Sequence, residues 1–176
     1  MSTPDQKHKE ISAELEASRG TKRNKHLVFS LKDEKYGIPL SVVKEVIGMT
    51  EITPIPHVPV YFKGLINLRG KIISVIDLRV KLEVGKAEIS PKKTCIIITE
   101  INDLIIGVIV DEVEEVAGFE PSQMEHNLDI QSKVSKDFIT GVAKISDRRL
   151  ILLLDISKTL SLEELNILKN HSSSEA

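Results

Sequence analysis

The chain has 176 residues, of which 41% are hydrophobic and 28% are charged, and its net charge at pH 7 is −2. This length suits one compact domain or two very small ones, and it can bury a core without a disulfide or a metal. Scattered Lys and Arg argue against a nucleic-acid partner. No apolar run approaches the ~18 residues of a membrane helix, and no apolar signal segment opens the chain, so the composition favours a cytoplasmic protein.

The first 25 residues carry ten charged side chains and almost no large apolar ones beyond Ile11 and Leu15. Such a segment buries too little apolar surface to offset the entropy that ordering costs, so we expect a flexible polar tail over residues 1–25. A helix from Lys7 to Ser18 could form, and it would matter only if it packed on the rest of the chain.

Short apolar strands then follow in pairs separated by polar turns, as in β-hairpins. Five strands are expected in the first half, at 27–31, 36–40, 45–53, 64–68 and 72–78, and five in the second, at 94–100, 104–111, 113–119, 139–145 and 150–156. Gly70 can supply the positive φ that a tight turn at 69–71 requires. The repeat predicts two copies of one small, partly open five-stranded barrel, at about 26–85 and about 92–158.

The C-terminal segment has helical character. Ser161 and Glu164 have the spacing of a capping box, and Leu165 and Leu168 fall on one helical face. We expect a short helix over about 161–169 that packs back on the barrels.

Catalytic and metal-binding patterns are missing from the sequence. No histidine lies at ligand spacing from another donor, no glycine-rich phosphate loop opens a helix, and the acidic run 111–115 is typical of solvated strand ends. The single cysteine, Cys95, lies in a run typical of a buried strand. We therefore expect no enzyme, no metal and no cofactor, and a protein that works by docking.

Two polar residues and a set of aliphatic ones are candidates for a docking surface. Glu45 and Arg69 interrupt apolar stretches. Each is either the exposed member of an alternating strand or part of a binding rim where the two pair with each other. With aromatic residues at only 3%, apolar contacts would be aliphatic, and the candidates are Val43, Val46, Ile47, Ile52 and Ile55.

Six short motifs occur in order along the chain: Leu-Val-Phe-Ser-Leu (27–31), Tyr-Gly-Ile (36–38), Val-Lys-Glu-Val (43–46), Phe-Lys-Gly (62–64), Asn-Leu-Arg-Gly (67–70) and Val-Ile-Asp-Leu-Arg (75–79). Together they resemble the CheW family of bacterial chemotaxis coupling proteins, over about residues 26–168. The resemblance implies an all-β fold of two SH3-like five-stranded barrels packed side by side, with a short C-terminal helix.

The same resemblance implies a non-enzymatic adaptor that links methyl-accepting chemoreceptors to the histidine kinase CheA at the inner face of the membrane. One barrel end would bind the regulatory domain of CheA, and a groove between the barrels would receive the helical cytoplasmic tip of the receptor. Carried over by motif, the receptor-binding residues are Val43, Glu45, Gly64, Asn67 and Arg69, and the kinase-binding residues are Ile47 and Ile52.

Three other classes remain open. A CheV-type module or the regulatory domain of the kinase would share the fold, but both normally come attached to another domain, and the segments outside 26–168 are short. A β-barrel nucleic-acid factor would need a basic face with stacking aromatics. A hydrolase would need catalytic groups that converge in a pocket.

Overall fold

The structure is a computed structural model that describes residues 4–17, 25–85, 88–126 and 137–172. The strands are β1 (Lys25–Leu31), β2 (Glu34–Pro39), β3 (Val43–Gly48), β4 (Phe62–Leu68), β5 (Lys71–Asp77), β6 (Cys95–Ile101), β7 (Leu104–Val110), β8 (Glu112–Gly118), β9 (Met124–Glu125), β10 (Ile139–Ser146) and β11 (Arg149–Leu154). The helices are α1 (Pro4–Ala17), α2 (Leu78–Lys81), α3 (Ile156–Thr159) and α4 (Leu162–His171), with 3₁₀ turns η1 (Leu40–Val42) and η2 (Pro121–Gln123). Within the described residues, no helix combines the length and the apolar character needed to cross a bilayer.

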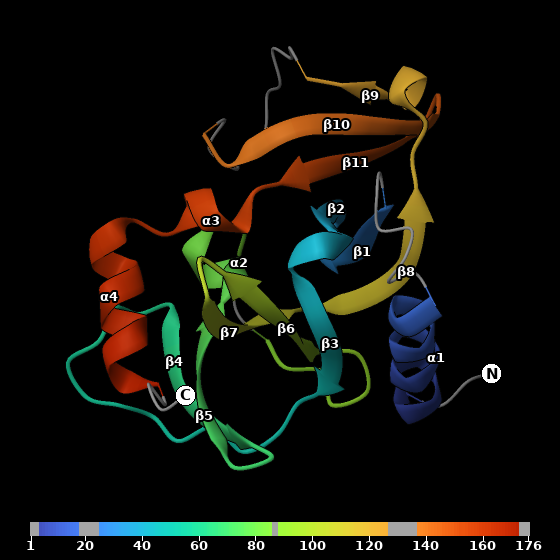
Figure 1. Cartoon of the computed structure of the whole chain (residues 1–176). Coiled ribbons are helices and arrows are strands. Elements are labelled where there is room, and N and C mark those ends of the chain that lie inside the picture. The colour runs from blue at the N-terminus through green and yellow to red at the C-terminus, as the bar shows by residue number, and fades with distance from the viewer. Residues whose placement is uncertain (1–3, 18–24, 86–87, 127–136, 173–176) are drawn as a thin grey trace.

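The strands form two sheets, which confirms the expected class of two β subdomains with a short C-terminal helix (Figure 1). The β1 sheet has the order β8-β1-β2-β11-β10-β9, and the β3 sheet has the order β3-β6-β7-β5-β4. The two-residue strand β9 extends the β1 sheet to six strands, one more than the repeat predicts.

Each sheet takes strands from both halves of the chain, so the prediction of two consecutive units, about 26–85 and about 92–158, is wrong. The first hairpin of each half joins the sheet formed by the other half: β1 and β2 lie with β8, β10 and β11, while β6 and β7 lie with β3, β4 and β5. Four pairings join strands of the two halves: β1 with β8 and β3 with β6 are antiparallel, and β2 with β11 and β5 with β7 are parallel. All four join strands that are distant in sequence, so no local turn signal marks them.

The hairpins themselves follow from local chemistry. Arg69 and Gly70 form the two-residue turn between β4 and β5, with φ values of 49° and 87°. Asn102 and Asp103 do the same between β6 and β7, with φ values of 51° and 65°. Positive φ at both central residues matches the twist of paired strands. The positive φ expected at Gly70 is confirmed.

Apolar side chains form three clusters, and strand alternation distributes them. Phe29 of β1 and Ile97 of β6 belong to one large cluster that both sheets share. Their neighbours point the other way: Val28 lies in a second cluster with strands of the β1 sheet, and Ile96 lies in a third with strands of the β3 sheet. Because successive side chains point to opposite faces, a strand buried on both faces is a continuous apolar run.

Two short helices occupy equivalent places in the two sheets. Asp77 ends β5 and its carboxylate accepts a hydrogen bond from the backbone N–H of Arg79, which caps α2. Asp155 follows β11 and caps α3 in the same way through Ser157. Aspartate at this position satisfies one of the unpaired N–H groups of a helix start. The repeat in the sequence thus extends to a strand-Asp-helix corner in each half.

The predicted C-terminal helix is confirmed as α4. Ser161 and Glu164 form the expected capping box, with Ser161 Oγ accepting from Glu164 N–H at 3.1 Å. Leu168 is fully buried, and its carbonyl accepts a hydrogen bond from Ser74 Oγ of β5 at 2.7 Å. The helix is therefore fixed to the β3 sheet by apolar packing and by a buried hydrogen bond.

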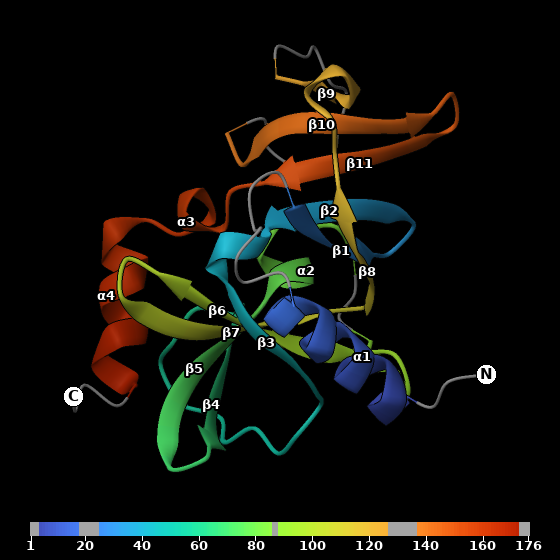
Figure 2. The ribbon, with the colours of Figure 1, turned by 45° about the vertical axis from the view of Figure 1, so that its right-hand side comes forward.

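The N-terminal segment differs from the expected polar tail. Residues 4–17 form α1, which packs against β3 and β8 (Figure 2). Ile11 and Leu15, the two large apolar residues of the segment, are buried at 3% and 5% exposure. The prediction of a flexible tail is therefore wrong for 4–17, because these two side chains meet an apolar surface that the sequence alone does not place beside them. The rest of the tail, 1–3 and 18–24, lies outside the described residues.

Candidate functional site

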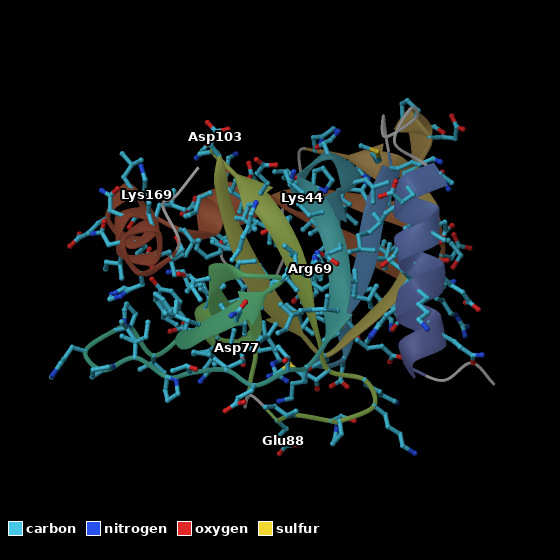
Figure 3. The ribbon with its side chains drawn as sticks, turned by 60° about the horizontal axis from the view of Figure 1, so that its bottom comes forward. Lys44, Arg69, Asp77, Glu88, Asp103 and Lys169 are labelled. Carbon is cyan, nitrogen blue, oxygen red and sulfur yellow. The ribbon has the colours of Figure 1, made fainter. Side chains whose placement is uncertain are left out.

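The candidate residues Glu45 and Arg69 form an ion pair. Arg69, labelled in Figure 3, lies in the turn after β4. Its guanidinium donates to the carboxylate of Glu45 in β3. The strands β3 and β4 are the two edges of the β3 sheet, so the pair joins one edge of the sheet to the other. The sheet is therefore curled far enough for a long side chain from the β4–β5 turn to reach β3, as in a partly open barrel.

Exposure differs between the two partners. The Arg69 side chain is 70% exposed, whereas the Glu45 side chain is 26% exposed. An exposed pair contributes little to stability because solvent screens it. The guanidinium keeps other N–H donors directed at solvent, in a planar arrangement that suits a carboxylate or a carbonyl of a partner.

Asn67 supports the turn that carries Arg69. Its side-chain oxygen accepts a hydrogen bond from Gly70 N–H at 2.9 Å, although the residue itself is exposed. Arg69 has a φ of 49°, a left-handed conformation that is uncommon for residues other than glycine. The Asn67 contact holds this conformation, so Asn67 positions the Arg69 side chain.

Gly64 and Val43 lie inside the protein. Gly64 has a φ of +142°, and a Cβ there would lie 2.1 Å from the carbonyl oxygen of Thr53. The missing side chain lets the loop after β3 approach β4, where Thr53 and Leu65 exchange two backbone hydrogen bonds of 2.8 and 2.9 Å. Val43 is only 4% exposed. These two residues shape the surface, and Glu45, Asn67 and Arg69 reach solvent.

The candidate kinase-binding residues lie together. Ile47 and Ile52 are half-buried and pack against the same apolar cluster of the β3 sheet. Ile55 packs against the large shared cluster instead. Among the residues that the structure describes, the most exposed large aliphatic side chains are four that sequence reasoning did not select: Val60, Ile89, Leu150 and Leu162.

A buried ion-pair network lies at the other end of β5. Arg79 makes two hydrogen bonds to Asp77, of 3.0 and 2.8 Å, and one of 2.7 Å to Asp111. The side chains of Arg79 and Asp77 are 2% exposed. Burial opposes the charge of Arg79, but the hydrogen bonds outweigh it and raise the pKa of the guanidinium.

The network connects the two sheets. Asp111, between β7 and β8, also accepts a hydrogen bond from the backbone N–H of Lys32, in the turn between β1 and β2. Asp77 and Arg79 belong to the end of the β3 sheet, whereas Lys32 belongs to the β1 sheet. Sequence reasoning missed this cluster, whose only signal is an arginine directly after a run of buried strand residues.

A third ionic group holds α4. Glu164 accepts hydrogen bonds from Tyr61 and from Lys81, the latter at 2.6 Å, and Lys81 lies 4.5 Å from the centre of the Tyr61 ring. Partial burial of Glu164 opposes its charge, but Lys81, Tyr61 and the Ser161 backbone N–H lower the pKa of the carboxyl to about 2. The group secures the first turn of α4.

Comparisons with known proteins agree on one family. The family model described as CheW-like domain matches residues 25–164. The chain is 34% identical to the chemotaxis protein CheW of Klebsiella aerogenes, covering 82% of this chain and 89% of that protein. It is 33% identical to CheW of Bacillus subtilis, over 79% of this chain and 88% of that one. The solved structure of the scaffolding protein TtCheW from Thermoanaerobacter tengcongensis has 37% identity and a TM-score of 0.72, covering 80% of this chain and 94% of that one.

Proposed function

Since the chain belongs to the CheW-like domain family, whose members are chemotaxis scaffold proteins, we propose that it couples methyl-accepting chemoreceptors to the histidine kinase CheA. It acts without catalysing a reaction, at the inner face of the membrane through receptor arrays. The observation that carries the proposal is the Arg69–Glu45 ion pair. It holds the exposed guanidinium of Arg69 between the two edge strands of the β3 sheet, with N–H donors left for a partner.

The receptor side of the adaptor uses Glu45, Asn67 and Arg69 as its solvent-facing residues. Glu45 fixes the guanidinium of Arg69 by accepting its hydrogen bond, and Asn67 fixes the turn that carries Arg69 by accepting a hydrogen bond from Gly70 N–H. Such preorganisation lowers the entropy that binding costs. Val43 and Gly64 act from inside, because their burial sets the position of β3 and β4.

The kinase side uses Ile47 and Ile52, with the regulatory domain of CheA as the partner. Both side chains are half-buried and pack on one cluster, so each is already partly immobilised before a partner binds. An aliphatic contact with the partner then costs little side-chain entropy. Two surfaces on one chain let two weak contacts act together, because the first contact raises the effective concentration of the second partner.

A titration with each partner tests the proposal. Wild type, Arg69→Ala and Lys71→Ala are titrated with a chemoreceptor signalling-tip fragment and, separately, with the CheA regulatory domain. Lys71 is exposed in the same hairpin and is the matched control. We expect Arg69→Ala to weaken receptor binding by about tenfold to a hundredfold and to leave kinase binding unchanged, since a charged hydrogen bond is worth roughly 1.5–3 kcal/mol.

Two results would overturn the proposal. A folded wild-type chain that binds neither partner would rule out the adaptor function. Equal loss of receptor binding in Arg69→Ala and Lys71→Ala would show that general charge, and not the Arg69–Glu45 pair, attracts the receptor.

A further inference from the structure

The helix α1 covers a surface made by two strands of different sheets. It packs against β3, an edge of the β3 sheet, and against β8, an edge of the β1 sheet (Figure 2). We call the side of Val43–Gly48 and Glu112–Gly118 that α1 covers the β3–β8 surface; Ile47 packs on the separate cluster of the β3 sheet and is not part of it. Ile11 and Leu15 lie one helical turn apart, and both are buried. The contact is thus a narrow apolar stripe of a helix on two strand edges.

Polar contacts fix the direction of the helix. Lys7 Nζ lies 3.0 Å from Glu112 Oε1 in β8, and the His8 ring lies beside Gly48 at the end of β3. These contacts come from the same side of the helix as Ile11 and Leu15, since residues three and four apart share a face. Lys9 is exposed on the other side. The helix therefore has one docking face, with a basic residue over an acidic strand.

The helix α1 lies on the outside of the two sheets and depends on them for its own stability. The helix lies before residue 25, where the match to the CheW-like domain begins, so it adds to the family domain. A helix of 14 residues is marginal in water by itself, so its helicity depends on docking. Its contacts with the sheets include the buried side chains of Ile11 and Leu15 and the Lys7–Glu112 ion pair, whose side chains are 33% and 30% exposed, so the pair adds little stability.

We propose that α1 is an intramolecular occupant of the β3–β8 surface, which a partner helix must displace in order to bind there. The surface fits an amphipathic helix with an aliphatic pair one turn apart and a basic residue toward Glu112. This inference rests on the proposed function and on the expectation, from the family resemblance, that the helical receptor tip binds in a groove between the two barrels. Only molecules with an undocked helix can then bind the receptor, so the apparent affinity is the intrinsic affinity multiplied by the fraction of such molecules.

The test compares full-length variants by titration with the receptor signalling-tip fragment. Ile11→Asp with Leu15→Asp undocks the helix, Lys7→Glu weakens the docking by repelling Glu112, and Lys9→Glu is the control with the same charge change on the exposed face. We expect the double variant to bind the fragment about tenfold more tightly than wild type, the value for a helix that is docked in roughly 90% of molecules. Lys7→Glu should give a smaller gain in the same direction, and Lys9→Glu should match wild type.

Hydrogen exchange on the same samples reports α1 directly. In wild type, addition of the fragment should increase exchange of the backbone amides of residues 4–17 while β3 and β8 become more protected. Equal affinity in wild type, the double variant and Lys7→Glu, or unchanged exchange in α1 when the fragment is bound, would overturn the displacement. Absence of binding in wild type and in the double variant would instead overturn the proposed function, and the displacement with it.

Discussion

The strand β5 has an arginine just beyond each of its ends, and the two side chains have opposite environments. Arg69 precedes the strand and pairs with Glu45 at 70% exposure. Arg79 follows the strand and pairs with Asp77 and Asp111 at 2% exposure. The Arg69–Glu45 and Arg79–Asp111 pairs each join segments that are distant in sequence, yet only the Arg79 side chain lies in the interior.

The contrast separates a structural ion pair from a recognition one. In water, an ion pair is screened and its partners remain available to another molecule. In the interior, every charge must be satisfied, and loss of one partner leaves an uncompensated charge. Arg79 has its donors occupied by Asp77, Asp111 and the carbonyl of Glu88, so it fixes the two sheets, whereas Arg69 retains donors for a partner.

The largest effect is expected from breaking the buried network. Arg79→Ala should lower the free energy of unfolding by about 3–5 kcal/mol, because Asp77 is left buried without its cation. Urea denaturation of wild type and variant measures the difference. Arg79→Lys keeps the charge but loses the two-point contact with Asp77. Its free energy of unfolding should lie between those of wild type and Arg79→Ala. A loss below about 1 kcal/mol in Arg79→Ala would contradict the assignment of a structural role.

The next effect concerns how the Arg69 hairpin is held. Gly64→Ala should cost about 1–3 kcal/mol, because the new Cβ would collide with the Thr53 carbonyl and push the loop away from β4. Gly70 also has a positive φ, but a Cβ added there by Gly70→Ala would meet no atom within 4 Å. This substitution should therefore cost about 1 kcal/mol or less. Thermal unfolding of both variants gives the comparison, and equal losses would mean that close packing at Gly64 is not limiting.

The Lys81–Glu164 pair is an intermediate case, with side-chain exposures of 16% and 23%. Because the folded-state pKa of Glu164 is about 2, below its usual 4.5, the stabilisation is present above pH 4.5 and is lost as the pH falls toward 2. Glu164→Gln should remove this part of the acid sensitivity. Unfolding curves between pH 2 and pH 6 test it, and an unchanged pH dependence in the variant would exclude Glu164 as the titrating group.

The smallest effect on stability is expected at Arg69. A double-mutant cycle with Arg69→Ala and Glu45→Ala should give a coupling energy of about 0.2–1 kcal/mol, since Arg69 is largely solvated. The same variants should show a larger effect in receptor binding. A coupling energy in unfolding as large as the loss at Arg79 would remove the distinction between the two ends of β5.

Parts of the candidate site could be predicted because their signals are local. The Asn67 to Gly70 segment has the residues of a tight turn, and Glu45 and Arg69 stand out as polar residues within apolar stretches. Their pairing was one of two open interpretations, and the structure shows it. The burial of Val43 and Gly64 could not be predicted, because it depends on which other strand or loop approaches each of them.

The sequence by itself determined the strands other than β9, though it placed β3 at 45–53 instead of Val43–Gly48, and it determined most turns, the capped C-terminal helix and the repeat. Alternation and turn chemistry act between residues close in the chain. The tertiary structure decided three further features: the exchange of the first hairpins between the two sheets, the burial of Arg79 with Asp77 and Asp111, and the docking of α1 on β3 and β8. Each depends on contacts between segments that are distant in sequence. The free energy of such contacts comes from surfaces that exist only once both sheets have formed.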